Sequence, residues 1–280
     1  FNTGVVGGSW ATGGSLNTAR ESLGGTGVST AALAFGGGST GVNVTELYNG
    51  TNWTEVNNLT TARANIQGNG TQTATLAFGG YTGSQTAVTE LWNGTNWTEV
   101  NDLNTARYSP GGAGTSTAGL AFGGAAPVKN ETELWNGTNW TEVNNLGTAR
   151  YGAAGAGTST AALAFGGTAD PPNTALTETW NGTNWTEVND LNTARYGLGG
   201  AGTQTAALAF GGNPRTNVTE TWNGTNWTEV GDLGTARDGL AGAKSGTNTA
   251  TLAFGGATPA ASAATEEWNA GAQVKTIDTD

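Results

Sequence analysis

The side chains that most often carry chemistry are either absent from this chain or repeated along it. The sequence contains no His and no Cys, so it lacks the usual ligands for zinc, copper and haem iron. A Ser-His-Asp or Cys-His nucleophile cannot be assembled for the same reason. Asp and Glu remain, 21 in all, and a glycosidase needs only two carboxylates. Carboxylate chemistry on a glycoside is therefore the catalytic hypothesis that remains.

Most of the glutamates recur in the short contexts T-E-L, T-E-T and T-E-V, as at Glu90, Glu99, Glu178 and Glu187. A carboxylate that recurs in every repeat is expected to be structural. The Arg of a second recurring motif, T-A-R, is a natural partner for it. This pattern favours a protein that is not an enzyme.

Asp102, Asp190 and Asp232 recur at one position between the repeats, where carboxylate oxygens could bind calcium. Other repeats place Asn58 and Asn145 there, which favours a solvated turn. The recurring Gly-Gly doublets are not followed by the Lys of a phosphate-binding loop. We therefore expect no metal site and no cofactor.

The sequence N-G-T stands in five of the repeats and matches the acceptor for N-glycosylation. A Thr-rich hairpin gives the same letters by default, so glycosylation is a secondary hypothesis. The acceptor residues would be Asn49, Asn93, Asn136, Asn181 and Asn223.

The charge of the chain limits its partners. The formal net charge is −11, and the ten Lys and Arg residues are scattered singly. Such a surface repels phosphate backbones and anionic lipid, so we expect no nucleic-acid partner. No apolar run approaches the roughly 18 residues of a membrane span, so no membrane insertion is expected. The chain opens at Phe1 without any Met, which indicates either a fragment or a processed chain. Loss of an export signal would place it outside the cell, at a cell surface or at a virion surface.

Internal repetition dominates the sequence. The motif L-A-F-G-G occurs six times at spacings of 43 to 45 residues, and T-A-R also occurs six times. A period in this range is typical of four-stranded propeller blades, whereas helical repeats would need long segments with a period of 3.6 residues, which are not visible. The repeats start near residues 20, 63, 107, 150, 195 and 237.

The repeat at 195–237 contains four expected strands. A Gly-rich first strand over 195–203 precedes a short apolar strand over 205–211. After a variable stretch, a third strand over 218–222 and a fourth over 226–230 flank an Asn-Gly turn. The hexapeptide WNGTNW around this turn places two Trp on neighbouring strands, close enough to pair. The sequence leaves open whether the loop between them holds two or four residues.

Small sheets of this kind bury their faces by packing against one another round an axis. Gly-rich first strands suit the crowded centre of such a ring, and the Trp would then lie between the blades. The sequence therefore predicts an all-β, six-bladed propeller with four antiparallel strands per blade, as a single domain over residues 1–280.

Three features of the repeats point to a family. An apolar strand ends in Gly-Gly, an aromatic residue and a Trp stand five residues apart around a turn, and an Arg stands ten residues beyond that Trp, as from Trp185 to Arg195. Together they resemble the kelch repeat over nearly the whole chain, which implies a kelch-type β-propeller. The repeated sequence NGTNWTEVN also resembles that of kelch-like fibre and surface proteins of marine bacteriophages and bacteria.

The last blade lacks a fourth strand of its own, and each terminus of the chain contains a segment that could supply it. Trp10 stands ten residues before Arg20, as in the complete repeats, so we expect a strand within residues 1–12 to close the ring. Residues 270–280 contain a second candidate from Val274 to Ile277. A spare strand could pair with the edge of a neighbouring copy, so the candidate assembly strands are those of Val5, Trp10, Val274 and Ile277. An ordinary closed ring with an extra rim strand is the alternative.

Strand direction alternates, so the two faces of the ring differ. One face carries the nearly identical hairpin turns, and the other carries loops that vary most between repeats: 38–43, 81–87, 125–130, 168–175, 213–217 and 257–263. Loops on a rigid scaffold commonly carry recognition. The candidate recognition residues are Tyr81, Tyr108, Tyr151, Tyr196, Asp170 and Arg215. The alternatives are that these loops are unconstrained and that the Tyr rings serve packing.

These features favour a non-enzymatic structural or adhesive unit of an extracellular fibre, filament or virion appendage, which assembles with copies of itself. The principal alternative is a glycan-binding propeller, in which aromatic rings stack on sugars and the variable loops select among them. A carboxylate-dependent enzyme acting on glycosides is the third hypothesis.

Overall fold

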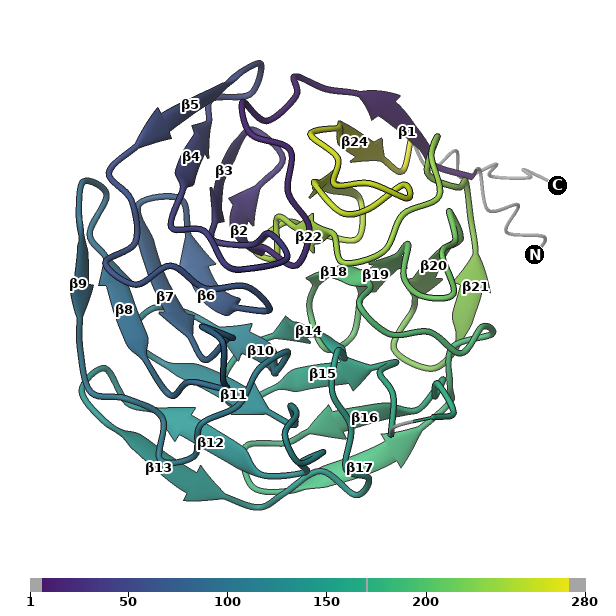
Figure 1. Cartoon of the computed structure of the whole chain (residues 1–280). Coiled ribbons are helices and arrows are strands. Elements are labelled where there is room, and N and C mark those ends of the chain that lie inside the picture. The colour runs from purple at the N-terminus through teal and green to yellow at the C-terminus, as the bar shows by residue number, and fades with distance from the viewer. Residues whose placement is uncertain (1–6, 170, 272–280) are drawn as a thin grey trace, which may run out of the picture.

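A computed structural model describes residues 7–169 and 171–271 of the chain. These residues form 24 β-strands and no helix, grouped into six antiparallel sheets of four strands each. The sheets stand round a central axis as the blades of a six-bladed β-propeller (Figure 1). The predicted fold class is confirmed.

Blade 1 contains β2 (Gly24–Val28), β3 (Ala31–Phe35), β4 (Thr45–Tyr48) and β5 (Trp53–Val56), and blade 2 contains β6 (Gln67–Thr71), β7 (Ala74–Phe78), β8 (Thr89–Trp92) and β9 (Trp97–Glu99). Blade 3 contains β10 (Gly111–Gly114), β11 (Gly119–Phe122), β12 (Thr132–Trp135) and β13 (Trp140–Val143), and blade 4 contains β14 (Ala154–Gly157), β15 (Ala162–Phe165), β16 (Thr177–Trp180) and β17 (Trp185–Val188). Blade 5 contains β18 (Gly199–Gly202), β19 (Ala207–Phe210), β20 (Thr219–Trp222) and β21 (Trp227–Glu229), and blade 6 contains β22 (Ala241–Gly242), β23 (Ala250–Phe254), β24 (Thr265–Asn269) and β1 (Ser9–Thr12).

The first strand of each blade lies nearest the axis, and the fourth lies at the rim (Figure 1). The first strands are rich in Gly because the backbones of neighbouring blades approach closely there. At Gly155, for example, an added Cβ would lie 2.4 Å from the carbonyl oxygen of Gly112 in the preceding blade. Side chains larger than hydrogen are therefore excluded from such positions.

The hydrophobic core lies between the blades. The ring of Trp97, on the fourth strand of blade 2, lies 5.2 Å from that of Phe35 in blade 1. Its indole Nε1 donates a hydrogen bond of 3.0 Å to Oγ1 of Thr45, also in blade 1. The same two contacts recur at all six junctions, with ring distances of 4.9 to 5.2 Å. The prediction that these Trp lie between blades is confirmed.

The repeated hexapeptide forms the hairpin between the third and fourth strands. Trp92 and Trp97 are cross-strand partners, with ring centroids 5.4 Å apart. Four residues separate them, which settles the loop length. The Oδ1 of Asn93 accepts hydrogen bonds of 2.9 Å from the backbone N–H groups of Thr95 and Asn96. The Asn thus shapes the turn through its side chain.

Each T-A-R arginine is buried against a third-strand glutamate of the blade that follows it. The Nη2 of Arg63 lies 3.0 Å from Oε1 of Glu90, and both side chains are 0% exposed. The other oxygen of Glu90 accepts hydrogen bonds from the N–H and the hydroxyl of Thr60, both at 2.7 Å. The six pairs are Arg20–Glu46, Arg63–Glu90, Arg107–Glu133, Arg150–Glu178, Arg195–Glu220 and Arg237–Glu266. The expected pairing is confirmed for the T-E-L and T-E-T glutamates. The T-E-V glutamates, such as Glu99 and Glu187, instead lie exposed on the fourth strands.

Strand β1 closes the ring. It pairs antiparallel with β24 from the other end of the chain, with Trp10 opposite Trp268. Trp10 also contacts blade 5, because its Nε1 donates to Oγ1 of Thr219 at 3.0 Å and its ring lies 5.0 Å from that of Phe210. The prediction that the Trp10 strand closes the last blade is confirmed. Val5, Val274 and Ile277 lie outside the described residues, so their part in assembly stays a prediction.

A polar contact links four pairs of neighbouring blades on the face of the repeated turns. The Nδ2 of Asn101, which follows β9, donates to the carbonyl of Thr138 at 3.0 Å and to Oδ1 of Asn139 at 2.8 Å. The residues at the same position that bond to the next blade are Asn57, Asn144 and Asn189. At the two junctions of blade 6 a glycine takes this position, namely Gly14 and Gly231.

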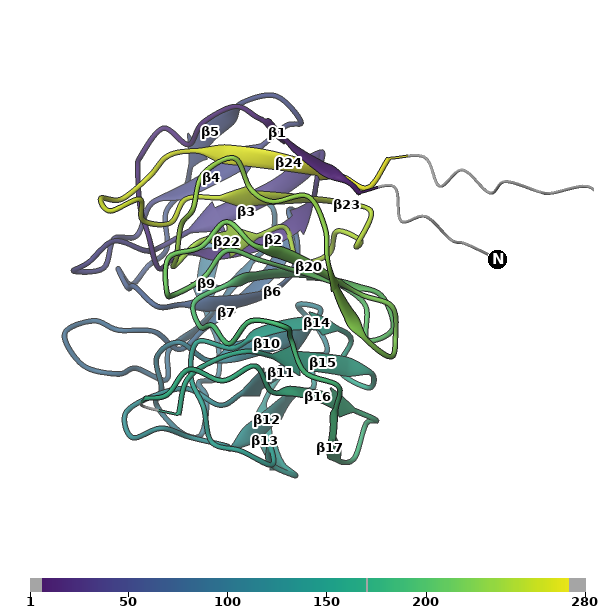
Figure 2. The same cartoon turned by 90° about the vertical axis from the view of Figure 1, so that its right-hand side faces the viewer.

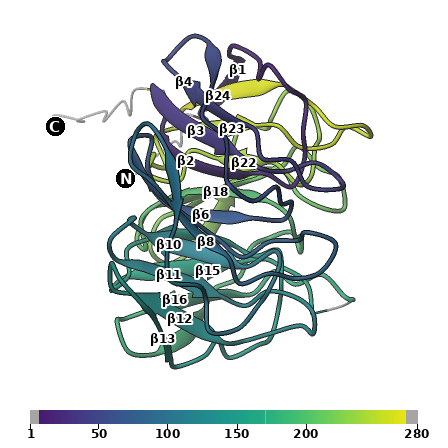
Figure 3. The ribbon, with the colours of Figure 1, turned by 60° about the vertical axis from the view of Figure 1, so that its left-hand side comes forward.

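The side views in Figure 2 and Figure 3 separate the two faces of the ring. The longer loops between second and third strands project on the left in Figure 2, and the short hairpins lie on the right. The expected segregation of variable loops to one face is therefore present.

Candidate binding face

Four tyrosines lie side by side on the face of the variable loops. The ring centroid of Tyr108 lies 5.8 Å from that of Tyr81 and 6.3 Å from that of Tyr151. The ring of Tyr151 in turn lies 6.0 Å from that of Tyr196. The rings meet edge to face, an arrangement that aromatic pairs favour, and all four residues are half-buried. They form a continuous row over blades 2 to 5, which we call the tyrosine arc.

Short backbone bridges position the arc. Tyr108 directly follows a T-A-R motif, and its N–H and carbonyl pair with Ala125 in the variable loop of the same blade, at 3.1 and 2.9 Å. The next two tyrosines along the chain are bridged to their own loops in the same way. Tyr81 comes instead from the variable loop of blade 2 and pairs with Ala64. Rings from two different positions of the repeat therefore continue one arc.

A polar cluster lies on the same face in blades 5 and 6. The Nε of Arg215 lies 3.1 Å from Oδ1 of Asp238 and donates to the carbonyl of Ala257 at 3.0 Å. The Nδ2 of Asn213 donates to the other Asp238 oxygen at 3.1 Å. The Arg215 side chain is 38% exposed, so part of it is accessible to a ligand. This partly solvated ion pair contributes little to stability.

The residue after T-A-R gives this face two unlike sides. It is Tyr in blades 3 to 5, Asp238 in blade 6 and Glu21 in blade 1. The face therefore carries aromatic rings on one side and two carboxylates on the other, one of them paired with Arg215. Asp170, the remaining predicted recognition residue, lies outside the described residues.

A closed ring of six backbone hydrogen bonds surrounds the axis on the variable-loop face. In each blade the second residue after the T-A-R arginine donates its N–H to the carbonyl of the equivalent residue in the preceding blade, at 2.7 to 2.9 Å. The members are Ser22, Asn65, Ser109, Gly152, Gly197 and Gly239. Their φ angles lie between 49° and 64°, a region that Gly, Asn and other small polar residues tolerate best. These residues line a cavity of about 90 Å³.

The buried carboxylates of the blades are not available to a substrate. Glu46 is 0% exposed and paired with Arg20. Burial lowers the pKa of Arg20 to about 10 by desolvation, which outweighs the attraction of Glu46. The guanidinium therefore stays charged at neutral pH, and the pair holds a blade connection to its third strand. A carboxylate pair for glycoside cleavage would have to come from elsewhere.

The Asp and Asn residues between repeats do more than form solvated turns, because their side chains also bind the third strands. The Oδ1 of Asp102 accepts a hydrogen bond of 2.9 Å from the N–H of Thr89, the first residue of β8. The residues that do the same in other blades are Asn58, Asn145, Asp190 and Asp232. The five Asn of the N-G-T turns are exposed, and their glycosylation stays a prediction.

One group at the other end of the axis escaped the sequence analysis. Lys244 and Asn69 line a cavity of about 190 Å³ beside the repeated turns. Two features of the sequence could have indicated this site. The last repeat is two residues longer at this point, and Asn69 stands where most repeats have Ala.

The fold defines the class of this protein, a six-bladed β-propeller. Neither the comparison with protein-family models nor that with curated proteins gives a match. Among residues 7–169 and 171–271, no helix is long and apolar enough to cross a membrane. The same residues contain no group of three or more Asp and Glu side chains that could hold a metal ion.

Proposed function

We propose that the chain is a non-enzymatic structural or adhesive propeller of kelch type, which works outside the cell in a fibre, filament or virion appendage and assembles with copies of itself. The observation that supports assembly is the composition of the outer strands. Five of them carry a glutamate at the rim: Glu55, Glu99, Glu142, Glu187 and Glu229. Strand β1 has Thr12 at that position and no charged residue.

Charge on an edge strand discourages pairing with the edge of another sheet. Five rims are therefore protected, and β1 is the uncharged edge at which a strand of another copy could add. Three of its four residues are exposed, so the edge is accessible. The six interlocked junctions supply the rigidity that a structural unit requires.

The experiment is to measure assembly of the chain as a function of concentration, by light scattering after size exclusion and by negative-stain imaging. Thr12→Glu gives β1 the glutamate of the other rims and is expected to leave a folded monomer. Thr54→Glu, an exposed change on β5, is the matched control and should assemble like the wild type. A wild-type chain that stays monomeric, or Thr12→Glu assembling normally, would refute the assembly proposal.

The tyrosine arc specifically favours glycan binding as the second candidate function. Its half-buried rings offer apolar faces beside a polar cluster, which suits a ligand with both apolar and hydroxyl surfaces. A glycan array with the wild type and with Tyr108→Ala tests this. Saturable glycan binding that is lost in the variant would support this function. Glycan binding that is unchanged in the variant would exclude the tyrosine arc as the binding site. Turnover of a glycoside, abolished by removal of one Asp or Glu, would support the third candidate, an enzyme.

A further inference from the structure

The last repeat contains an insertion at the end of its first strand. Ten positions separate Leu198 from Leu208 in blade 5, whereas twelve separate Leu240 from Leu252 in blade 6. The first strand and hairpin of blades 1 to 4 have the shorter spacing as well. Aligning the following G-T-x-T turns identifies the extra residues as Lys244 and Ser245. A lysine is thereby added at the axis, where the other repeats have small residues.

Ser245 links the insertion to another blade across the axis. Its hydroxyl donates a hydrogen bond of 2.6 Å to the carbonyl of Gly70. Gly70 belongs to blade 2, which is not a neighbour of blade 6 in the ring. The inserted segment is therefore held in place beside the axial cavity.

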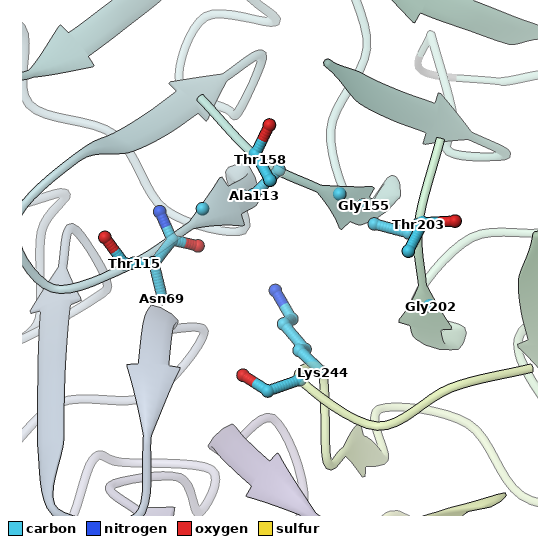
Figure 4. A pocket seen from close by; sticks show the side chains of 13 residues that line it. Asn69, Ala113, Thr115, Gly155, Thr158, Gly202, Thr203 and Lys244 are labelled. Atoms are coloured by element: carbon cyan, nitrogen blue, oxygen red, sulfur yellow. The ribbon is translucent and has the colours of Figure 1, made fainter. Parts of the chain in front are cut away.

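Lys244 faces a cavity that contains no counter-charge. The cavity has a volume of about 190 Å³, and its lining consists of Lys244 together with Asn, Gly, Ala, Ser and Thr residues. The side chain of Lys244 points into the opening (Figure 4). Although the residue as a whole is half-buried, its Nζ is buried and has no hydrogen-bond partner within the described residues. Unpaired buried ammonium groups are costly and mark sites where a ligand can supply the missing partner.

A second unpaired polar atom faces the same cavity. Asn69 is 1% exposed, and its Nδ2 donates to the carbonyl of Leu120 at 3.0 Å, which fixes the orientation of the amide. Its Oδ1 has no partner in the part of the chain that the structure describes. The side chain is directed toward the opening, as Figure 4 shows. Among the described residues, the cavity thus has one buried cationic donor and one buried neutral acceptor without a partner.

We propose that this axial cavity binds a small oxyanion that also carries a hydroxyl group, such as a 2-hydroxy carboxylate or a monoprotonated phosphate. The Lys244 ammonium pairs with the anionic oxygen, and Asn69 Oδ1 accepts the hydrogen bond of the hydroxyl. A cation is disfavoured by the lysine. A volume of about 190 Å³ is sufficient for a ligand of this size.

Binding is coupled to protonation of the lysine. Burial lowers the pKa of Lys244 to about 7 by desolvation, and no other residue that lines the cavity titrates near neutral pH. An anion selects the protonated form, so its apparent affinity follows the protonated fraction of the free protein. From pH 6 to pH 8.5 that fraction falls roughly 30-fold. The affinity should fall by the same factor.

The test is calorimetric titration of the whole chain with glycolate and with acetate at pH 6 and pH 8.5, where both probes are present mainly as anions. Glycolate is expected to bind more tightly than acetate, and both to weaken about 30-fold at the higher pH. Lys244→Met should abolish binding of both. Asn69→Ala should reduce the affinity for glycolate to that for acetate, because it removes the acceptor for the hydroxyl and leaves Lys244 in place.

A second readout separates a lost site from a misfolded variant. The chain has three lysines, so the Lys244 side chain can be followed by ¹³C NMR, and its pKa should rise when glycolate is added. Tryptophan fluorescence of each variant confirms that the blades remain packed. No binding to the wild type at pH 6, equal binding to Lys244→Met, or a Lys244 titration unchanged by glycolate would overturn the proposal.

Discussion

The buried pair of Arg63 and Glu90 makes a quantitative prediction about stability. Glu90→Gln removes the charge that neutralises Arg63 and replaces one of two acceptor oxygens with a donor. The two oxygens now accept from Arg63 at 3.0 Å and from the N–H and hydroxyl of Thr60 at 2.7 Å. Leaving one member of a fully buried ion pair without its partner costs about 3–5 kcal/mol. For a domain of this size that corresponds to a fall in Tm of roughly 6–20 °C.

The matched control variant is Glu99→Gln, on the strand next to that of Glu90. Glu99 is the cross-strand partner of Glu90 in β9 but is exposed to solvent. Glu99→Gln is expected to change the free energy of unfolding by no more than about 0.5 kcal/mol. Denaturant unfolding followed by tryptophan fluorescence measures both variants, and the double change Arg63→Met with Glu90→Leu should recover much of the loss. If Glu90→Gln proves no more costly than Glu99→Gln, the structural role assigned to the six buried pairs is wrong.

Three further predictions concern the blade junctions and the axis. Trp140→Ala removes a 5% exposed indole between blades 2 and 3 and its hydrogen bond to Thr89, so calorimetric unfolding should show a loss of about 3–5 kcal/mol. Gly231→Asn introduces the residue that links four other junctions. It should nevertheless lower Tm, because an added Cβ would lie 2.1 Å from the carbonyl oxygen of Gly8. A rise in Tm would contradict the packing described for β1. In a buffer without small oxyanions, Lys244→Met should stabilise the chain by about 5 kcal/mol at pH 6 and about 2 kcal/mol at pH 9. The pKa of Lys244 in the folded chain, about 7, lies below its unfolded value of 10.5. The native chain therefore gains stability as the pH rises from 7 to 10.5, and its difference from Lys244→Met shrinks. A stability difference that does not change with pH would show that Lys244 does not titrate in this range.

The periodic residues of this chain determine most of its fold. Apolar strands ending in Gly-Gly, an Asn-Gly turn between two Trp and an Arg at a fixed spacing recur six times, so each local preference is reinforced by five copies. That redundancy predicted the blades, their number, the position of the Trp between them and the closing role of Trp10. The exact strand ends were less well predicted, since β18 begins at Gly199 rather than at 195. Tyr196 and Gly197 leave the strand because they bond to a variable loop and to neighbouring blades.

The candidate sites depend on residues that break the repeat, and these only the tertiary structure could bring together. Tyr81 and Tyr108 occupy different positions of their repeats, yet the packing of blade 3 against blade 2 places their rings 5.8 Å apart. Asn69 and Lys244 are separated by most of the chain and meet because all six first strands converge on one axis. Sequence alone specified the blade through local propensity and periodic hydrophobicity. The packing of the blades round one axis decided which of the exceptional residues share a surface, because their proximity depends on contacts between blades and not on any pattern within one repeat.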